Sequence, residues 1–190
     1  MRSFGGPDGE NPAAGLIFDG LGNLYGTTVR GGSLTDCNGN GCGTVFELTL
    51  GTGGTWTEKV LHKFGSFKGD GSGPTGGLIL NSIGQLYGTT QDGGDADQGT
   101  AFELTLKDDG RWVENQLHSF ANNGKDGFSP RDGSLVFDAS GNLCGTTIGG
   151  GAYGGGTVFE VIPEPRFTRN QEFHGRGTRA IALKARSAGQ

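Results

Sequence analysis

The sequence predicts an all-β protein assembled from three copies of one four-stranded unit. Glycine accounts for 41 of its 190 residues, and a glycine inside a helix costs about 1 kcal/mol relative to alanine, so long helices are not expected. Short aromatic and β-branched runs lie between the glycines, a pattern typical of strands joined by turns. The same sub-motifs return three times along the chain, with a period of about 56 residues.

Each unit holds four strand candidates in a constant order. In the first unit they cover residues 16–19, 24–28, 44–49 and 56–64. The first carries GLIFD and the second LYGTT, and the tight hairpin between them has glycine or asparagine where a positive φ is needed. The third carries GTVFELT and the fourth WTEKVLHKF. All four return in the second unit, and the third unit ends in a degraded version of the fourth.

Four antiparallel strands repeated at an even period are typical of a β-propeller blade. The sequence therefore predicts three blades within residues 1–174, followed by a basic C-terminal tail. The expected boundaries are residues 1–4 for a remnant outer strand, about 5–64, 65–120 and 121–174 for the blades, and 175–190 for the tail. The outer strand of the third blade is expected at residues 167–174.

Three blades alone do not make a closed propeller, because closed rings have 4–8 blades. An open arc would expose two apolar blade faces, which is an aggregation hazard. We therefore expect two chains to associate head to tail as a homodimer, giving a six-bladed ring with two equivalent seams. The alternative is a three-bladed piece of a longer parent protein, in which the tail covers one open face.

The sub-motifs GLIFD, GNLYGTT and GTVFELT recur in order with D-G-x-x-P turns and tryptophan-led strands. Over about residues 1–165 this pattern resembles the Gloeo/Verruco (GloVer) tandem repeat family. The resemblance implies a propeller-like protein that is extracellular or anchored at the cell surface, and it implies no common activity. The chain has only three units and leaves the pattern after Pro165. No signal peptide is visible, so the extracellular or cell-surface location is expected of the parent protein.

Charge and hydropathy exclude two classes of partner. Residues 1–165 contain 9 basic and 19 acidic side chains, whereas residues 166–190 contain 6 basic and 1 acidic. An acidic body offers no surface that neutralises phosphates, so nucleic acid is not an expected partner. The sequence has no run of 18 apolar residues, so membrane insertion is not expected either. We interpret the basic tail as a solvated or packing segment.

Two sets of loops are expected on one face of the disc: those between the second and third strands, and those between successive units. Loops held by a rigid scaffold often carry function, so this loop face is the expected ligand site. Side chains that differ between units are free to contact an asymmetric ligand. The binding residues predicted on this basis are Arg30, Lys68, Arg131 and Tyr153.

Three aspartates recur on this face, each before a glycine and four residues before a proline: Asp8, Asp70 and Asp126. An Asp-Gly pair near a proline is a turn signature, because the carboxylate accepts backbone N–H groups. The functional hypothesis is instead a ring of catalytic carboxylates around the central funnel. A glycoside hydrolase needs two carboxylates, about 5–5.5 Å apart for retention or about 6.5–9.5 Å apart for inversion.

One loop carries a candidate metal site and another a candidate disulfide. Asp92, Asp95 and Asp97 place three carboxylates within a short loop, which suits Ca²⁺, although the spacing matches no complete EF-hand and a solvated acidic loop is the alternative. Cys37 and Cys42 are expected to close a small disulfide in an oxidising compartment.

Other recurring polar residues are interpreted as structural. The glutamates on the third strand are expected to accept hydrogen bonds from neighbouring hydroxyls such as Thr27 or Thr89: Glu47, Glu103 and Glu160. The histidines are expected to be packing or surface residues: His62 and His118 on the fourth strand, and His174 in the degraded copy. Cys144 replaces the tyrosine of LYGTT and is expected to be a buried free thiol.

The function predicted from these features is a secreted or cell-surface repeat module that binds a carbohydrate or another polymer through the loop face. The alternative is a glycoside hydrolase that uses carboxylates around the funnel, and a third hypothesis is a purely structural repeat. No cofactor is required by any of the three, and Ca²⁺ is the one candidate ion.

Overall fold

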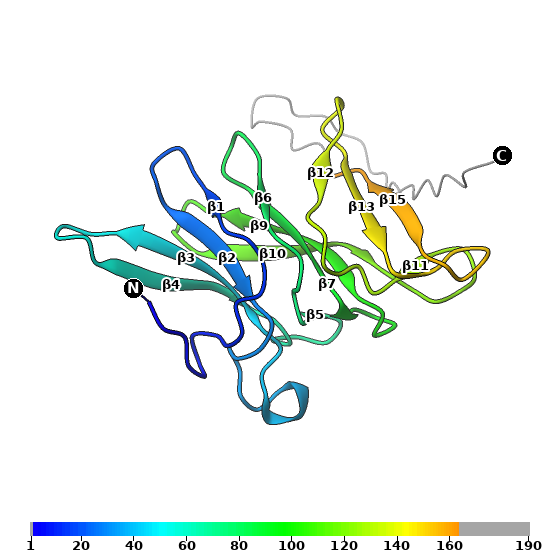
Figure 1. The fold of residues 1–190 in the computed structure, drawn as a ribbon, viewed down its shortest axis with the longest axis horizontal. Helices are drawn as coiled ribbons and strands as arrows, with labels where there is room; N and C mark the ends of the chain where they lie inside the picture. Colours follow the sequence, from blue (N-terminus) through cyan, green and yellow to red (C-terminus); the bar gives the residue numbers. More distant parts are fainter. Residues whose placement is uncertain (1, 164–190) are drawn as a thin grey trace.

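The computed structural model describes residues 2–163 and consists of strands joined by turns and loops (Figure 1). The first sheet has the order β1 (Ile17–Phe18), β2 (Leu24–Thr28), β3 (Thr44–Leu50), β4 (Trp56–Lys63). The second sheet has the order β6 (Ile79–Leu80), β7 (Leu86–Thr90), β9 (Thr100–Leu106), β10 (Trp112–Ser119). The third sheet has the order β12 (Val136–Phe137), β13 (Leu143–Thr147), β15 (Thr157–Val161). All neighbouring strands are antiparallel.

Two short ribbons bring the two sets of loops together. They pair β5 (Gly71–Ser72) with β8 (Asp92–Gly93), and β11 (Gly127–Phe128) with β14 (Gly149–Gly150). In the first unit a bridge between Glu10 and Arg30 takes the same place. Each ribbon ties the loop that enters a sheet to the loop between its second and third strands. The hairpins after β1, β6 and β12 project at the other end of the sheets (Figure 1).

The predicted all-β fold and the antiparallel order of the strands within each unit are confirmed. The second strand of the first unit has the expected bounds, whereas the first strand is shorter because only Ile17 and Phe18 pair with it. Within residues 2–163 the sheets close into neither a barrel nor a complete propeller. The outer strand expected at residues 167–174 and the tail expected at 175–190 lie outside the described residues.

Helical structure in the described part of the chain is limited to one 3₁₀ turn, η1 (Cys37–Gly39). None of that helical structure has the length and apolar character needed to cross a membrane.

Glycine in the middle of each LYGTT-type strand permits a close approach between neighbouring strands. A Cβ atom on Gly26 would lie 2.7 Å from Cζ of Phe46 on β3, far inside van der Waals contact. The same relation joins Gly88 to Phe102 and Gly145 to Phe159. Each phenylalanine ring therefore lies across the backbone of the neighbouring strand. This close contact explains the glycine, which would otherwise weaken the interior of a strand.

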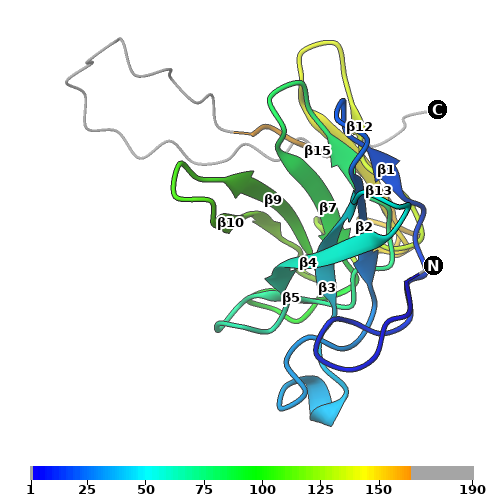
Figure 2. The ribbon, with the colours of Figure 1, turned by 90° about the vertical axis from the view of Figure 1, so that its left-hand side faces the viewer.

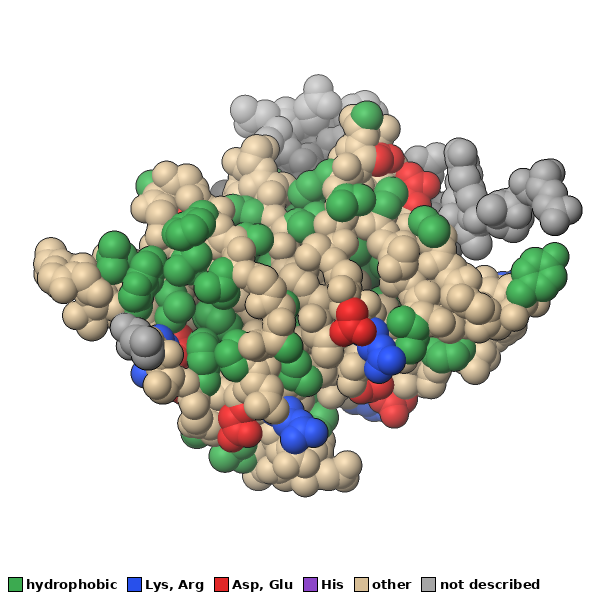
Figure 3. Space-filling view, viewed as in Figure 1, with side chains coloured by type: hydrophobic (Ala, Val, Ile, Leu, Met, Phe, Trp, Pro, Cys, Tyr) green, Lys and Arg blue, Asp and Glu red, His purple; other side chains and the backbone are tan. Residues whose placement is uncertain are grey.

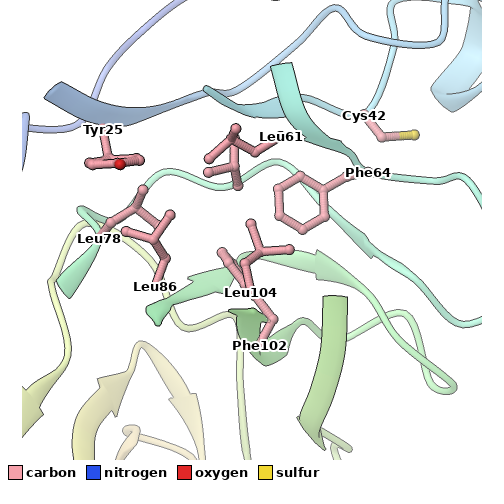
Figure 4. Close-up of a cluster of buried hydrophobic side chains, with 9 residues drawn as sticks. Tyr25, Cys42, Leu61, Phe64, Leu78, Leu86, Phe102 and Leu104 are labelled. Atoms are coloured by element: carbon pink, nitrogen blue, oxygen red, sulfur yellow. The ribbon is translucent and has the colours of Figure 1, made fainter. Parts of the chain in front are cut away.

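The three sheets stack face to face, and the core lies in the two seams between them (Figure 2). In the first seam, Tyr25 and Leu61 of the first sheet pack against the second sheet (Figure 4). Val45 of the first sheet belongs to the same cluster. The residues of the second sheet in this cluster are Leu78, Leu86, Phe102 and Leu104. The second seam repeats the arrangement between the opposite face of the second sheet and the facing side of the third sheet. The second sheet thus buries one face against the first sheet and the opposite face against the third.

A phenylalanine ladder repeats along the stack. Phe64, which follows β4, packs on Phe102 of the second sheet with ring centroids 5.1 Å apart. Phe120, which follows β10, packs on Phe159 of the third sheet at 4.9 Å. Phe4 packs on Phe46 of the first sheet at 4.8 Å. The N-terminal segment therefore occupies the place where the outer strand of a preceding sheet would end.

Candidate functional site

The recurring aspartates are held inside their own turns. Oδ2 of Asp70 accepts hydrogen bonds from the backbone N–H of Ser66 at 3.0 Å and from its hydroxyl at 3.1 Å. Oδ1 accepts the backbone N–H of Gly71 at 2.7 Å. Equivalent bonds join Asp126 to Ala121 and Gly127, and Asp8 to Gly5. This geometry favours the turn interpretation, while the catalytic hypothesis for these aspartates stays a prediction.

Two of these aspartates also contact histidines that the sequence analysis treated separately. Nε2 of His62 lies 3.3 Å from Oδ2 of Asp70, and Nε2 of His118 lies 2.9 Å from Oδ2 of Asp126. Both rings also pack edge-on against the phenylalanine two residues later. The end of each outer strand is therefore tied to the turn that follows it.

Arg2 lies beside the turn aspartate that precedes the first sheet, Asp8, as His62 lies beside Asp70, which precedes the second sheet. Its guanidinium donates to Asp8 and, at 2.5 Å from Nε, to Oε2 of Glu58 on β4. The side chain of Glu58 is nearly buried. A basic residue, the turn aspartate and an outer-strand glutamate therefore meet at one place.

Glu114 on β10 is the counterpart of Glu58. It lies opposite Leu104, on the face of the second sheet that packs against the first. Burial, and then the charge of Asp70, raise the pKa of Glu114 to about 7, while His62 acts in the opposite direction. The seam between the first two sheets thus contains a carboxyl group that is largely protonated below neutral pH.

Two of the recurring glutamates, Glu47 and Glu103, accept hydrogen bonds from hydroxyls of the neighbouring strand as expected, but the donors are tyrosines. The Tyr25 hydroxyl donates to Glu47 at 2.9 Å, since the two residues are directly opposite in the β2–β3 register. Tyr87 and Glu103 repeat this pair at 3.0 Å. Thr27 Oγ1 has no hydrogen-bond partner within residues 2–163, so that proposed donor was wrong.

The third unit replaces this tyrosine by Cys144. An amide takes over the contact, and Asn142 Nδ2 donates to Glu160 at 2.7 Å. Cys144 carries a free thiol and is only half-buried, so the expectation of a buried thiol was wrong. The tyrosines at this position are covered by the next sheet, and Cys144 lies on the last described sheet.

A pocket of about 500 Å³ opens between the second and third sheets at the hairpin end of the strands. This volume falls in the range of small-molecule sites, about 300–1,000 Å³. Its wall is apolar, with Leu80, Ile83 and Phe137, whereas Gln85 and Glu103 contribute polar atoms. The pocket therefore lies at the end of the strands opposite the predicted loop face.

The polar side of the pocket is a connected hydrogen-bond network. Gln85 Nε2 donates to Glu103 at 2.7 Å, and its Oε1 accepts from Asn81 Nδ2 at 2.7 Å. The Tyr87 hydroxyl, which donates its one hydrogen to Glu103, lies 3.1 Å from the same Oε1. Gln85, Tyr87 and Glu103 are buried, so their orientations are set before any ligand arrives. The network therefore holds these polar groups against one another at the wall of the pocket.

Sequence reasoning missed this pocket, although a signal was present. The first and third units carry an aspartate and an asparagine at this hairpin, whereas the second unit carries Asn81 and Gln85. Ligand contacts specific to one unit were expected on the loop face alone. At the first seam, Trp112 of the second sheet packs against Tyr25 of the first, with ring centroids 6.4 Å apart. The residue of the third unit that corresponds to Trp112 is Phe167, which lies outside the described residues.

The four predicted binding residues are all exposed: Arg30, Lys68, Arg131 and Tyr153. Arg30 pairs through its backbone with Glu10, and the Arg131 guanidinium lies 3.5 Å from Asp132. They occupy loops of three different units, and none of them lines the pocket. Their binding role stays a prediction.

The acidic loop holds its carboxylates in separate contacts. Asp97 accepts the backbone N–H of Gly93 at 2.9 Å, and Asp92 accepts from Gln91 at 2.8 Å. The Asp95 backbone N–H donates to Ser119 at 2.8 Å. Within residues 2–163 no group of three or more His, Cys, Asp or Glu is arranged to hold a metal ion. The Ca²⁺ prediction therefore gains no support from this geometry.

Cys37 and Cys42 form a disulfide, with their Cα atoms 5.4 Å apart. Cys42 is buried in the first seam, whereas Cys37 is exposed in the loop. The bond therefore fastens the long loop between β2 and β3 to the core.

Comparison with known proteins gives one family. The model of the Gloeobacter/Verrucomicrobia repeat matches residues 1–111 and 33–182. Neither the curated proteins nor the solved structures contain a match to the chain.

Proposed function

The chain belongs to the Gloeobacter/Verrucomicrobia repeat family, and we propose that it is a secreted or cell-surface module that binds a carbohydrate or a related polymer. The three stacked sheets serve as blades of a propeller, which a second copy completes to six. The disulfide between Cys37 and Cys42 supports an oxidising location, because such bonds persist outside the cytosol.

The pocket between the second and third sheets carries this proposal. A sugar presents hydroxyl groups around its rim and an apolar C–H face, so its site needs polar groups beside an apolar platform. Phe137 and Leu80 supply the platform, and the polar side chains of Asn81 and Ser82 lie beside them in the wall of the pocket.

A glycan array followed by titration of the best ligand tests the proposal. Replacing Phe137 by alanine removes the platform and is expected to weaken binding at least about tenfold, equivalent to about 1.4 kcal/mol. The matched control is Tyr153→Ala, which removes a fully exposed aromatic ring from the loop face. Retained binding in Phe137→Ala together with loss in Tyr153→Ala would move the site to the loop face.

The same preparation distinguishes a binding module from a glycoside hydrolase. Binding is expected to survive Asp70→Asn and Asp126→Asn in protein that remains folded, since these carboxylates serve their turns. Turnover of chromogenic glycosides that either substitution abolishes would instead assign the hydrolase function. Absence of binding across the array would contradict the carbohydrate proposal.

A further inference from the structure

The first and third sheets each present a face whose counterparts in the stack are buried. Leu16 is 50% exposed, whereas its counterparts Leu78 and Leu135 are each 2% exposed. Val158 is 64% exposed, whereas its counterparts Val45 and Ala101 are fully buried. Residue type does not account for this difference, because leucine or a small apolar residue occupies the position in every unit. The difference in exposure follows instead from the position of each sheet in the stack.

Two surfaces follow from this comparison. The leading face belongs to the first sheet and consists of the exposed Leu16 and Phe18 together with Leu24; Phe46 and Leu48 beside them are already buried in the single chain. The trailing face belongs to the third sheet and includes Val136, Cys144 and Val158. Hydrophobic side chains gather over β1 and β2 in the space-filling view (Figure 3). Patches of this kind on a folded domain mark interaction sites.

The leading and trailing faces correspond to the two sides of the interface that the chain forms at each of its two internal seams. At each internal seam, residues equivalent to the trailing face pack against residues equivalent to the leading face. At the second seam Tyr87 packs edge-on against Phe137, with ring centroids 5.6 Å apart. Cys144 is the counterpart of Tyr87, and Phe18 is the counterpart of Phe137. Phe18 is 65% exposed in the single chain.

The N-terminal segment contacts the leading face as the end of an outer strand contacts the next sheet at an internal seam. Phe4 contacts Phe46 as Phe64 contacts Phe102 at the first seam. Arg2 contacts Asp8 and Glu58 from the position that His62 holds beside Asp70. The contacts made at an internal seam by the end of an outer strand are therefore already in place on the leading face.

We propose that the trailing face of one chain packs on the leading face of a second copy, at two equivalent seams, with Cys144 opposite Phe18 of the partner subunit. This inference rests on the propeller arrangement proposed above and not on the ligand. A heterologous interface of this kind forms a ring if the rotation closes and a filament if it does not. Two seams between two copies give the closed form.

Cross-linking from Cys144 tests the seam directly. In the full-length Phe18→Cys variant, a short bismaleimide is used because packed sheets lie about 10 Å apart, beyond the reach of a disulfide. Most of the protein is expected to migrate as a covalent dimer under denaturing conditions. Phe18 is exposed, so the substitution leaves the fold of the chain intact.

Two controls make the result specific. Phe18→Cys combined with Cys144→Ser is expected to give no dimer. Leu106→Cys, which places a thiol at a half-exposed apolar site on the second sheet, is also expected to give none. In the unmodified protein, alkylation of Cys144 is expected to speed up several-fold on dilution. A cross-linked ladder of higher oligomers would overturn the closed dimer. Failure to cross-link, with Cys144 alkylated equally fast at all concentrations, would overturn the seam while leaving glycan binding untouched.

Discussion

Replacing Phe102 by alanine is expected to lower the free energy of unfolding by about 3–5 kcal/mol. Phe102 is fully buried in the first seam, where its ring meets Phe64 and lies across the backbone of Gly88. Hydrogen-bonded strands on both sides hinder collapse into the cavity, so the loss includes the cavity as well as the transfer of the ring. Urea denaturation followed by circular dichroism measures the change.

Leu106→Ala is the matched control for this substitution. Leu106 lies at the end of the same strand and is half exposed, so a loss of less than about 1 kcal/mol is expected. If both variants lost similar small amounts, the seam would not be the core of the protein.

Replacing Glu114 by glutamine is expected to stabilise the protein at pH 8 and to leave its stability nearly unchanged at pH 4. The pKa of Glu114 is raised to about 7 in the fold by burial and by Asp70. The native state therefore binds more protons than the unfolded state between about pH 4.5 and 7, so stability falls as the pH rises through this window. The shift corresponds to about 3 kcal/mol at pH 8, an upper value because the group retains some contact with water.

Denaturation of the variant and the unmodified protein at pH 4, 6 and 8 gives the comparison. Asp108→Asn is the control, because it removes one negative charge from an exposed turn of the same sheet. That control is expected to show no comparable pH-dependent gain. A Glu114→Gln variant that is less stable than the unmodified protein at pH 8 would mean that the charged carboxylate has a stabilising partner in the seam.

Local patterns predicted the strands well, because each repeated motif contains its own strand and turn signals. LYGTT in the first unit corresponds to the whole of β2, and the glycine within it is required by a phenylalanine of the neighbouring strand. Repetition of these motifs was enough to predict the order of strands within each sheet. The placement of the loop entering a sheet and of its internal loop at the same end of the strands also followed from that order.

Contacts that depend on register or on the next sheet could not be read from the motifs. Tyr25 donates to Glu47 because of the β2–β3 register, whereas sequence proximity to Thr27 suggested a hydroxyl partner. His62 reaches Asp70 across a turn, and neither residue identifies the other in the sequence. The pocket depends on two units at once, with Gln85 from the second and Phe137 from the third. A comparison of units one by one therefore does not detect it.

The mass of the protein in solution tests the central claim, that the two exposed end faces of the stack are halves of one interface. Light scattering across a dilution series is the measurement. The closed pair of chains is expected at twice the chain mass of 19.6 kDa, falling toward the single-chain value only at low concentration. A mass of 19.6 kDa at every concentration would contradict the claim.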